Sequence, residues 1–434
     1  MKKADSFPSI MRAKKTNTIY TGIEIGSGSI KVVMGEFDEG DIIRVAGLAD
    51  VPSMRVLKGE ITDNDIVHEQ LVQALNRAEK MAKRDVKDVY LAINTGTMAS
   101  VNSIGACPAS GPNQTIAPKD VAHALSNARA YVLPPDKTEV NTIDRRLLLD
   151  GHREVVNPVH QVAKKVAADI HLMYGRYNSI ENACLLVERT MGYSALDACF
   201  SIVAAAFAVL SKEDMAQGTL VVDIGAGTTN YILFHGIGVF HSGQVTVGTD
   251  HIANDLAIGL EIPMVKARGI VKTLDRFGAS AVMTPDGDER PVKIAVPGMK
   301  TRTIPASVIE LVAEERLKEL FDIILEDLNR QSALPRMPNG VMLTGGGALI
   351  KGVDELAHRV FQLPVRAGIP RDVFCIDDVA SSPAFATPIG LLRWAKFLEK
   401  IEDGEKKTVT DKILQDVTTF FGKLFGGLRN ALRW

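Results

Sequence analysis

The sequence has few residues of the kinds that form disulfide frameworks or zinc sites. Of its 434 residues, four are cysteines and nine are histidines. The cysteines form no CxxC pair, which predicts free thiols; they are Cys107, Cys184, Cys199 and Cys375. The histidines form no HxxxH or HxH pair. We therefore expect His235 and His241, which flank a glycine-containing turn, to be structural and not metal ligands.

A strong net charge and long apolar runs are also missing. The formal net charge is −2, so we expect no general attraction to nucleic acid. The apolar stretch from Ile202 to Leu210 is too short to span a bilayer. No apolar segment follows Lys2 and Lys3, so we expect no signal peptide. With 46% hydrophobic residues, the chain has enough apolar material for two or more folded domains.

One stretch, residues 218–234, combines a buried strand with a glycine-rich turn. Leu220–Ile224 is an apolar, β-branched run that contains Asp223; a tight turn is expected at residues 225–227 and a second apolar run at residues 231–234. Backbone N–H groups in such a turn can approach an anion closely, and the adjacent carboxylate can hold Mg²⁺ through water. Alone, the pattern is equally typical of a structural turn.

The same pattern occurs near the N-terminus, in residues 22–34. Glu24 corresponds to Asp223, and residues 26, 28 and 29 correspond to residues 225, 227 and 228, at a constant offset of 199 residues. Such a duplication predicts two similar halves that face one ligand. A third glycine turn follows the strand-like run Val341–Thr344 and precedes a helix-like pattern at residues 353–361. It gives the backbone room to pass a flat base or sugar.

Two hairpins followed by a glycine turn, in this order, resemble the actin and sugar-kinase superfamily of ATP-binding proteins. Two further segments, Val245–Leu260 and Ser382–Leu391, and the amphipathic end of the chain resemble the bacterial FtsA family. The resemblance covers nearly all of residues 17–434. It implies an α/β, actin-like/ribonuclease H-like fold of two domains with a nucleotide cleft, an extra subdomain inserted in the first domain, and a C-terminal amphipathic helix.

The resemblance also implies ATP and Mg²⁺ as cofactors, bound between the two halves. Backbone amides of both hairpins would hold the phosphates, and Lys31 would add a positive charge. Asp223 and Glu24 would hold the metal through water, and the third turn would pass near the adenosine. The expected cofactor-binding residues are Glu24, Gly26, Ser27, Gly28, Ser29, Lys31, Asp223, Gly225, Ala226, Gly227, Thr228, Thr229, Gly345, Gly346 and Gly347.

The chain departs from the family pattern where the chemistry would be most sensitive. Glu24 and Asn230 stand where the family usually has Asp, and Arg268 and Val271 stand where a Glu and a Lys near the adenosine are usual. The segment that begins at Ser201 lacks the Glu-Pro that usually precedes its small residues. We therefore expect nucleotide binding with slow or absent hydrolysis, and we assign no catalytic residue.

The chain divides into segments whose apolar patterns differ. Residues 88–173 carry alternating strands that interrupt the first domain, and residues 307–329 predict a long helix with Ser307 as its N-cap. From these changes and the resemblance we expect a flexible basic tail (1–16), the first actin-like domain (17–87), the inserted subdomain (88–173), the first domain again (174–216), the second domain (217–253), its outer subdomain (254–306), the second domain again (307–373), the closing segment of the first domain (374–399), a linker (400–410) and the amphipathic helix (411–434).

Residues 411–434 predict an amphipathic helix that lies on a membrane without crossing it. At helical spacing the large apolar side chains fall within an arc of roughly 140°, and the basic residues fall outside it. Basic residues outnumber acidic ones by two, which suits an anionic leaflet. The residues expected to contact lipid are Ile413, Val417, Phe420, Phe421, Leu424, Phe425, Leu428, Leu432 and, at the interface, Trp434.

The resemblance further implies a peripheral adaptor on the cytoplasmic face of the inner membrane at the division site. It would assemble with itself into filaments, bind anionic lipid and the C-terminal peptide of the tubulin-like protein FtsZ, and recruit later division proteins. The peptide would bind within about residues 250–330, where four basic residues could meet its acidic groups: Arg276, Lys293, Lys300 and Arg302. The alternatives are a pilus-assembly actin-like adaptor without the lipid-binding tail and a sugar-kinase-like phosphotransferase, for which the sequence shows no base or sugar pocket.

Overall fold

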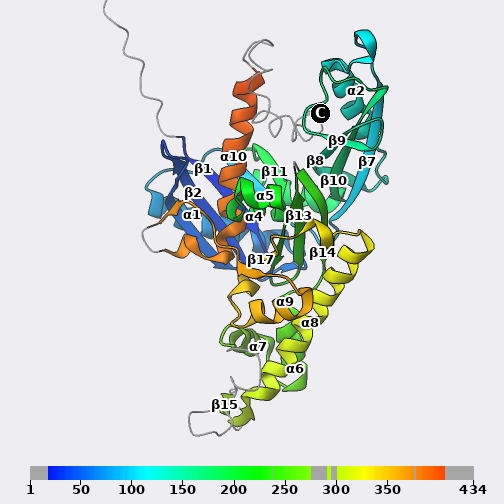
Figure 1. The fold of residues 1–434 in the computed structure, drawn as a ribbon. Helices are drawn as coiled ribbons and strands as arrows, with labels where there is room; N and C mark the ends of the chain where they lie inside the picture. The colour runs from blue at the N-terminus through cyan, green and yellow to red at the C-terminus, as the bar shows by residue number, and fades with distance from the viewer. Residues whose placement is uncertain (1–17, 237, 275–290, 295–300, 376–377, 406–434) are drawn as a thin grey trace, which may run out of the picture.

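A computed structural model describes residues 18–236, 238–274, 291–294, 301–375 and 378–405. Two α/β domains lie against each other, and a smaller subdomain projects from the first (Figure 1). Outside the described residues lie the basic tail 1–16, the amphipathic segment 411–434, Arg276 and Lys300.

The first domain is built on a six-stranded sheet in the order β11-β6-β1-β2-β3-β19. Strands β1, β2 and β3 form an antiparallel meander, and β6 and β11 continue the sheet in parallel, as expected for strands that return through helices. The strands are β1 (Tyr20–Ile25), β2 (Ser29–Phe37), β3 (Ile43–Pro52), β6 (Val89–Ile93), β11 (Asp197–Phe200) and β19 (Val373–Phe374); the short hairpin β4 (Val56–Leu57)–β5 (Glu60–Ile61) follows β3.

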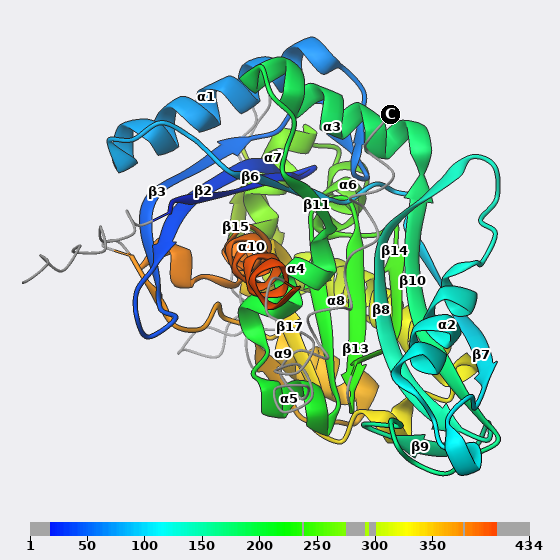
Figure 2. The same ribbon diagram turned by 90° about the horizontal axis from the view of Figure 1, so that it is seen from above.

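Helices cover both faces of this sheet. In Figure 2, α1 (Asn64–Ala82) and α3 (Tyr177–Met191) lie on the outer face, and α4 (Ser201–Val209) and α10 (Ala386–Glu405) lie on the face toward the second domain. Helix α4 is buried almost throughout because its residues are small or apolar. Its crossing with α10 is so close that a Cβ on Gly390 would lie 1.7 Å from the carbonyl oxygen of Ala204.

The projecting subdomain is a four-stranded antiparallel sheet in the order β7-β10-β8-β9. One helix packs on it, with a small apolar core of its own around Leu147, Val166 and Ala124. The elements are β7 (Ala99–Pro108), α2 (Pro118–Arg129), β8 (Lys137–Leu149), β9 (Arg153–Val155) and β10 (Lys165–Arg176).

The second domain repeats the plan of the first with a five-stranded sheet in the order β14-β13-β12-β17-β18. Its core is separate from that of the first domain and includes one face of the long helix α8. Its elements are β12 (Thr219–Ile224), β13 (Thr229–His235), β14 (Gly238–Val245), α6 (Thr249–Gly259), α7 (Met264–Val271), β15 (Pro291–Ile294), β16 (Arg302–Pro305), α8 (Ala306–Arg330), β17 (Val341–Thr344), α9 (Val353–Phe361) and β18 (Val365–Ala367).

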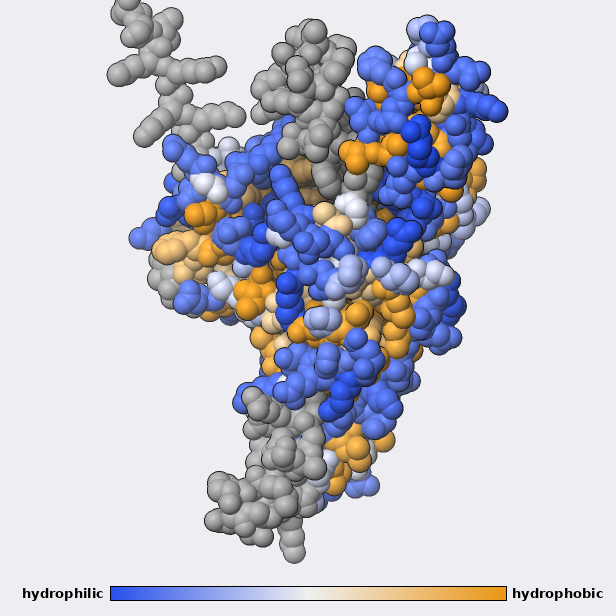
Figure 3. Space-filling view, viewed as in Figure 1, coloured by the Kyte–Doolittle hydropathy of each residue, from blue (hydrophilic) through white to orange (hydrophobic). Residues whose placement is uncertain are grey.

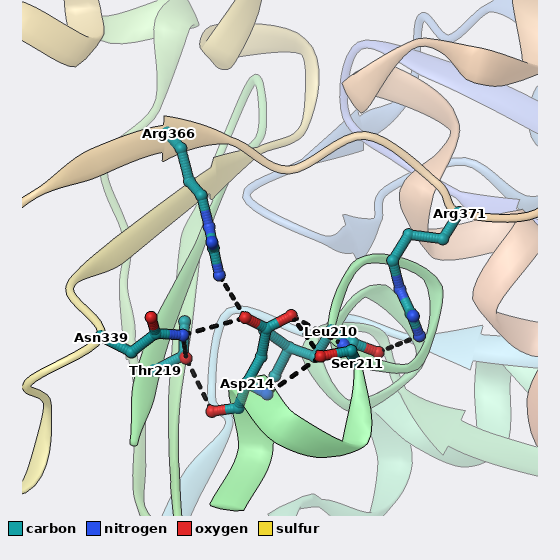
Figure 4. A network of polar contacts seen from close by, with 7 residues as sticks. All are labelled: Leu210, Ser211, Asp214, Thr219, Asn339, Arg366 and Arg371. Atoms are coloured by element: carbon teal, nitrogen blue, oxygen red, sulfur yellow. Dashed lines mark hydrogen bonds and ion pairs between the residues drawn. The ribbon is translucent and has the colours of Figure 1, made fainter. Parts of the chain in front are cut away.

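Two connections between the domains run close together (Figure 4). The first contains the short helix α5 (Lys212–Gln217), whose N-cap Ser211 forms a capping box with Asp214; the Asp214 carboxylate also accepts from the Asn339 amide at 2.9 Å. The second connects β18 to β19. Arg366 forms an ion pair with Asp214, and Arg371 donates through its backbone to the Ala208 carbonyl at 3.0 Å. These contacts therefore hold the two connections together.

Two sequence expectations differ from the structure. Strand β6, which the sequence pattern assigns to the inserted subdomain, pairs with β1 in the first domain's sheet. A short apolar strand does not show in its sequence which sheet it joins. Helix α8 begins at Ala306 after Pro305, with no side-chain cap. Ser307 therefore lies inside the first turn and is not the N-cap.

The surface is mostly hydrophilic on the face shown in Figure 3, with apolar residues in groups between polar ones. Within the described ranges, no helix is long and apolar enough to span a membrane. The four cysteines are free thiols.

Candidate functional site

The two predicted glycine turns have the same backbone geometry. The first turn (residues 26–28) joins β1 to β2, and the second turn (residues 225–227) joins β12 to β13. In the first, the Gly26 amide donates to the Ser29 carbonyl at 3.0 Å; in the second, Gly225 donates to Thr228 at 2.9 Å. The registers also match, since Glu24 pairs with Lys31 and Asp223 with Asn230. The sequence duplication is therefore a structural duplication.

The two turns lie directly against each other across the boundary between the domains. A Cβ on Gly28 would lie 3.0 Å from the Ala226 side chain, and one on Gly227 would lie 2.6 Å from the Ser27 hydroxyl. Only a glycine allows this approach at residue 227, because a Cβ there would also meet the backbone of Lys58 at 2.9 Å.

Some backbone amides of the turns remain free to bind a ligand. Gly26 and Gly225 use their N–H groups inside the turns, so they do not fit the expected role of phosphate donors. Among the described residues, the N–H groups at positions 27, 28, 226 and 227 have no hydrogen-bond acceptor. Clustered free amides of this kind favour an anion.

Two carboxylates and one amine lie beside the turns. Lys31 Nζ and Glu24 Oε2 are 3.0 Å apart, and both side chains are largely buried. Burial acts to lower the pKa of Lys31, but the Glu24 carboxylate outweighs it and the pKa is raised. Burial, and then the charge of Glu24, raise the pKa of Asp223 to about 7. A cation near Asp223 would relieve this unfavourable burial of negative charge.

The third turn (residues 345–347) packs on the second hairpin. Gly345 has a φ of +81°, and a Cβ there would lie 2.2 Å from Asp223 Oδ1. A Cβ on Gly347 would lie 2.3 Å from the Ile224 side chain. Gly346 differs, because it is exposed and an added Cβ would meet nothing within 4 Å. Two of the three glycines thus allow close packing, and one borders open space.

Several predicted side chains are already engaged within the protein. The Ser27 hydroxyl accepts from the Gly59 amide at 3.0 Å, and the Thr229 hydroxyl donates to the Val247 carbonyl at 2.8 Å. Arg268 binds both carboxylate oxygens of Asp250 at 2.8 Å, which joins α7 to α6. Ser29 lies at the start of β2, next to the first turn.

Sequence reasoning did not identify two residues of the site, Asn94 and Gln244. The Asn94 side chain exchanges hydrogen bonds with the Thr228 hydroxyl and accepts from the Gln244 amide at 3.0 Å. Gln244 also donates to Asn230 at 2.9 Å. The available signal was the position of Asn94 just after β6, because ligand-binding residues of α/β sheets often follow the carboxyl ends of strands.

The two histidines that the sequence predicts to be structural, His235 and His241, lie away from the turns. His241 Nε2 is 2.6 Å from Asp327 Oδ2, a carboxylate that also accepts from the Tyr231 hydroxyl. Within the described part of the chain, no group of three or more His, Cys, Asp or Glu side chains could hold a metal ion directly.

Two similar α/β domains that bring paired glycine turns together define an actin-like protein. Solved structures share this fold. The PilM-PilN type IV pilus biogenesis complex aligns with a TM-score of 0.61 at 16% identity, over 88% of this chain and 99% of that chain. MreB5 of Spiroplasma citri bound to AMPPNP aligns with a TM-score of 0.52 at 16% identity, over 89% and 98%.

Sequence comparisons narrow the class to one family. The family model for cell division protein FtsA matches residues 220–390, and that for the SHS2 domain inserted in FtsA matches residues 96–174. Cell division protein FtsA of Pseudomonas aeruginosa is 26% identical over 92% of this chain and 94% of its own length. That of Neisseria meningitidis is 28% identical over 87% and 90%. The chain belongs to the FtsA family, and its inserted subdomain is the family's SHS2 domain.

Proposed function

We propose that this chain is a nucleotide-binding cell-division protein that anchors FtsZ to the cytoplasmic face of the inner membrane. The observation that carries the proposal is the pair of matched turns, with free amides next to Glu24 and Asp223, in a chain of the FtsA family. The names of the relatives support the division role.

The residues at the turns fit a magnesium–adenine nucleotide. The free amides at residues 27, 28, 226 and 227 would hold phosphate oxygens, and Lys31 would add positive charge. Asp223 and Glu24 would hold Mg²⁺ through its bound waters. The metal would supply neutralisation of the phosphate charge. Gly346, which borders open space, would lie next to the adenosine.

The side chains around the second turn favour binding over hydrolysis. Asn94, Asn230, Gln244 and Ser201 form one hydrogen-bonded group of neutral amides and a hydroxyl. Neutral amides can orient a water molecule but cannot accept its proton. The nucleotide would therefore act as a conformational ligand with turnover well below the roughly 1 per second typical of kinases.

Residues 411–434 would anchor the protein to the membrane. Self-assembly into a filament would place many such anchors side by side, which strengthens membrane binding. The C-terminal peptide of FtsZ would bind the outer part of the second domain, and later division proteins would join the membrane-bound filament. The pilus-assembly alternative shares the fold, but the two matching family models are those of FtsA and its inserted domain.

Reconstitution tests the proposal. The purified full chain, FtsZ and vesicles containing anionic lipid are mixed with Mg²⁺-ATP, and the vesicles are floated in a density gradient. FtsZ should float only when this chain is present, and FtsZ that lacks its C-terminal peptide should stay at the bottom. If the chain floats but intact FtsZ does not float with it, the tethering role is wrong.

A further inference from the structure

Asn94 occupies a junction of three parts of the molecule. It follows β6 of the first domain and begins the five-residue connection, Asn94–Met98, that leads into β7 of the inserted subdomain. Its backbone packs under the turn between β4 and β5, where a Cβ on Gly59 would lie 2.0 Å from the Asn94 carbonyl oxygen. The position of Asn94 is therefore fixed by the first domain.

The side chain of Asn94 reaches across to the second domain. Its oxygen accepts from the Asn230 amide at 3.3 Å and the Gln244 amide at 3.0 Å, and its nitrogen donates to the Thr228 hydroxyl at 3.1 Å. Thr228 directly precedes β13, Asn230 is the second residue of that strand, and both are buried. Because a buried polar group that loses its partner is costly, this network holds the start of β13 in one position.

Contacts from the same connection continue into the inserted subdomain. The Met98 amide donates to Gln244 Oε1 at 3.2 Å, and the Ser100 hydroxyl donates to the Ser242 carbonyl at 2.7 Å. His171 of β10 lies 2.7 Å from both the Ser242 hydroxyl and Asn102. The inserted subdomain is thus attached to β14, the strand that carries Gln244.

We propose that Asn94 is a positioning residue that sets the second turn and ties it to the root of the inserted subdomain. The proposal rests on the proposed nucleotide binding for its functional consequence. A phosphate held at the second turn pulls on Thr228, and Asn94 passes that displacement to residues 95–102. The orientation of the inserted subdomain then depends on which nucleotide is bound.

Hydrogen exchange of the full chain provides the test, with and without nucleotide. Asn94→Ala removes the network, and Asn94→Asp keeps its shape and its acceptors but adds a negative charge. Asn127→Ala is the matched control, because Asn127 is an exposed amide with one bond to the Ala106 carbonyl. Without nucleotide, Asn94→Ala should speed exchange at residues 229–230, which belong to the sheet ladder, and at residues 99–102 by at least about threefold, while Asn94→Asp and Asn127→Ala keep the wild-type rates.

Calorimetry with Mg²⁺-ADP and a non-hydrolysable ATP analogue adds a readout that a merely structural residue would not move. Asn94→Asp should weaken binding of the analogue more than binding of ADP, by roughly tenfold, because it adds a negative charge beside the second turn, where the proposed function places a phosphate. Wild-type exchange rates in nucleotide-free Asn94→Ala overturn the proposal, and faster exchange at residues 229–230 alone overturns the tie to the subdomain. A wild-type chain that binds neither nucleotide refutes the proposed function, while the nucleotide-free exchange still decides the role of Asn94.

Discussion

The Asp214 carboxylate, in the first connection between the domains, forms an ion pair with the Arg366 guanidinium of β18, the strand from which the second connection starts (Figure 4). Asp214 also accepts from Ser211 within the capping box of α5 and from Asn339. Arg366 is half exposed, whereas Asp214 is largely buried. The carboxylate is therefore the centre of these contacts, and the guanidinium is one of its several partners.

We expect Asp214→Ala to destabilise the protein more than Arg366→Ala. The loss of an exposed partner costs about 0–1 kcal/mol, whereas loss of a helix cap together with buried hydrogen bonds costs about 2 kcal/mol. In urea denaturation, the unfolding midpoint should be highest for wild type, lower for Arg366→Ala and lowest for Asp214→Ala. Arg330→Ala, which breaks an exposed pair with Glu326, serves as the control and should change little. An Arg366→Ala midpoint below that of Asp214→Ala would contradict this account.

The same carboxylate should contribute to the pH dependence of stability. Burial alone would raise the pKa of Asp214, but hydrogen bonds from Ser211 and the contact with Arg366 outweigh it and hold the pKa at about 2. A pKa depressed in the folded state stabilises the protein above the unfolded value near 4 and loses that contribution as the pH falls toward 2. Wild type should lose about 1 kcal/mol more stability than Asp214→Asn between pH 5 and pH 3. If the free energies of unfolding of wild type and Asp214→Asn change in parallel between pH 5 and pH 3, Asp214 does not contribute to the pH dependence.

Nucleotide binding can be blocked at Gly346 without crowding the protein itself. Gly346→Val places its side chain in open space, so the unfolding midpoint should stay unchanged while affinity for Mg²⁺-ATP falls at least about tenfold. Gly227→Val is a poorer test because its Cβ would strike Ser27 and the Lys58 backbone, which lowers stability with or without ligand. Gly259→Val, also in open space but at the far end of α6, is the control. Equal calorimetric affinity for Gly346→Val and wild type would place the nucleotide elsewhere.

Patterns that repeat within a short stretch of sequence predicted local structure well. The two hairpins were visible because a carboxylate, two glycines and a hydroxyl recur at one offset, and α9 has the predicted bounds. The features that were missed depend on contacts between distant residues. Asn94 and Gln244 are 150 residues apart, and each alone is an ordinary polar residue after or within a strand.

The roles of single residues were harder to predict than the turns themselves. A glycine that packs against Asp223 and one that borders open space look alike in the sequence, yet Gly345 and Gly346 differ in this way. Arg302 was predicted to face a peptide, but it donates to the carbonyls of Leu260 and Glu261 at the end of α6. The sequence shows that a side chain is basic, but only the fold shows which group it contacts.

The hydrogen bonds from Arg302 to the end of α6 change how FtsZ-peptide binding should be tested. Arg302→Ala should lower stability because it removes hydrogen bonds at the end of α6, so weaker peptide binding by that variant is not diagnostic. Combined replacement of Arg276, Lys293 and Lys300 by Ala should instead weaken binding of a fluorescent FtsZ tail peptide several-fold, with the unfolding midpoint unchanged. Exposed Lys318 and Lys351, replaced together, provide the control. Unchanged peptide affinity in the triple variant would remove these residues from the site.

The final prediction concerns residues 411–434, which lie outside the described residues. At helical spacing Phe421 and Leu424 fall near the centre of the apolar arc, so Phe421→Glu with Leu424→Glu should abolish binding to vesicles that contain anionic lipid. Each apolar side chain contributes roughly 1.5–3 kcal/mol when it is fully buried. The three glycines at positions 422, 426 and 427 each oppose the helix by about 1 kcal/mol, so burial at the lipid surface has to supply the balance.

In the Phe421→Glu/Leu424→Glu variant, the effect of the two added charges has to be distinguished from the effect of losing apolar contact with lipid. Thr419→Glu with Asn430→Glu adds the same two charges on the opposite side of the helix, where they weaken attraction to anionic lipid without entering the apolar arc. At a low anionic fraction, the polar-face variant should still cosediment with vesicles, and the Phe421/Leu424 variant should stay in the supernatant with an unchanged unfolding midpoint. If both variants bind as wild type does, residues 411–434 are not the anchor. If both are lost equally, attraction between charges alone holds the chain at the membrane, and the amphipathic helix is wrong.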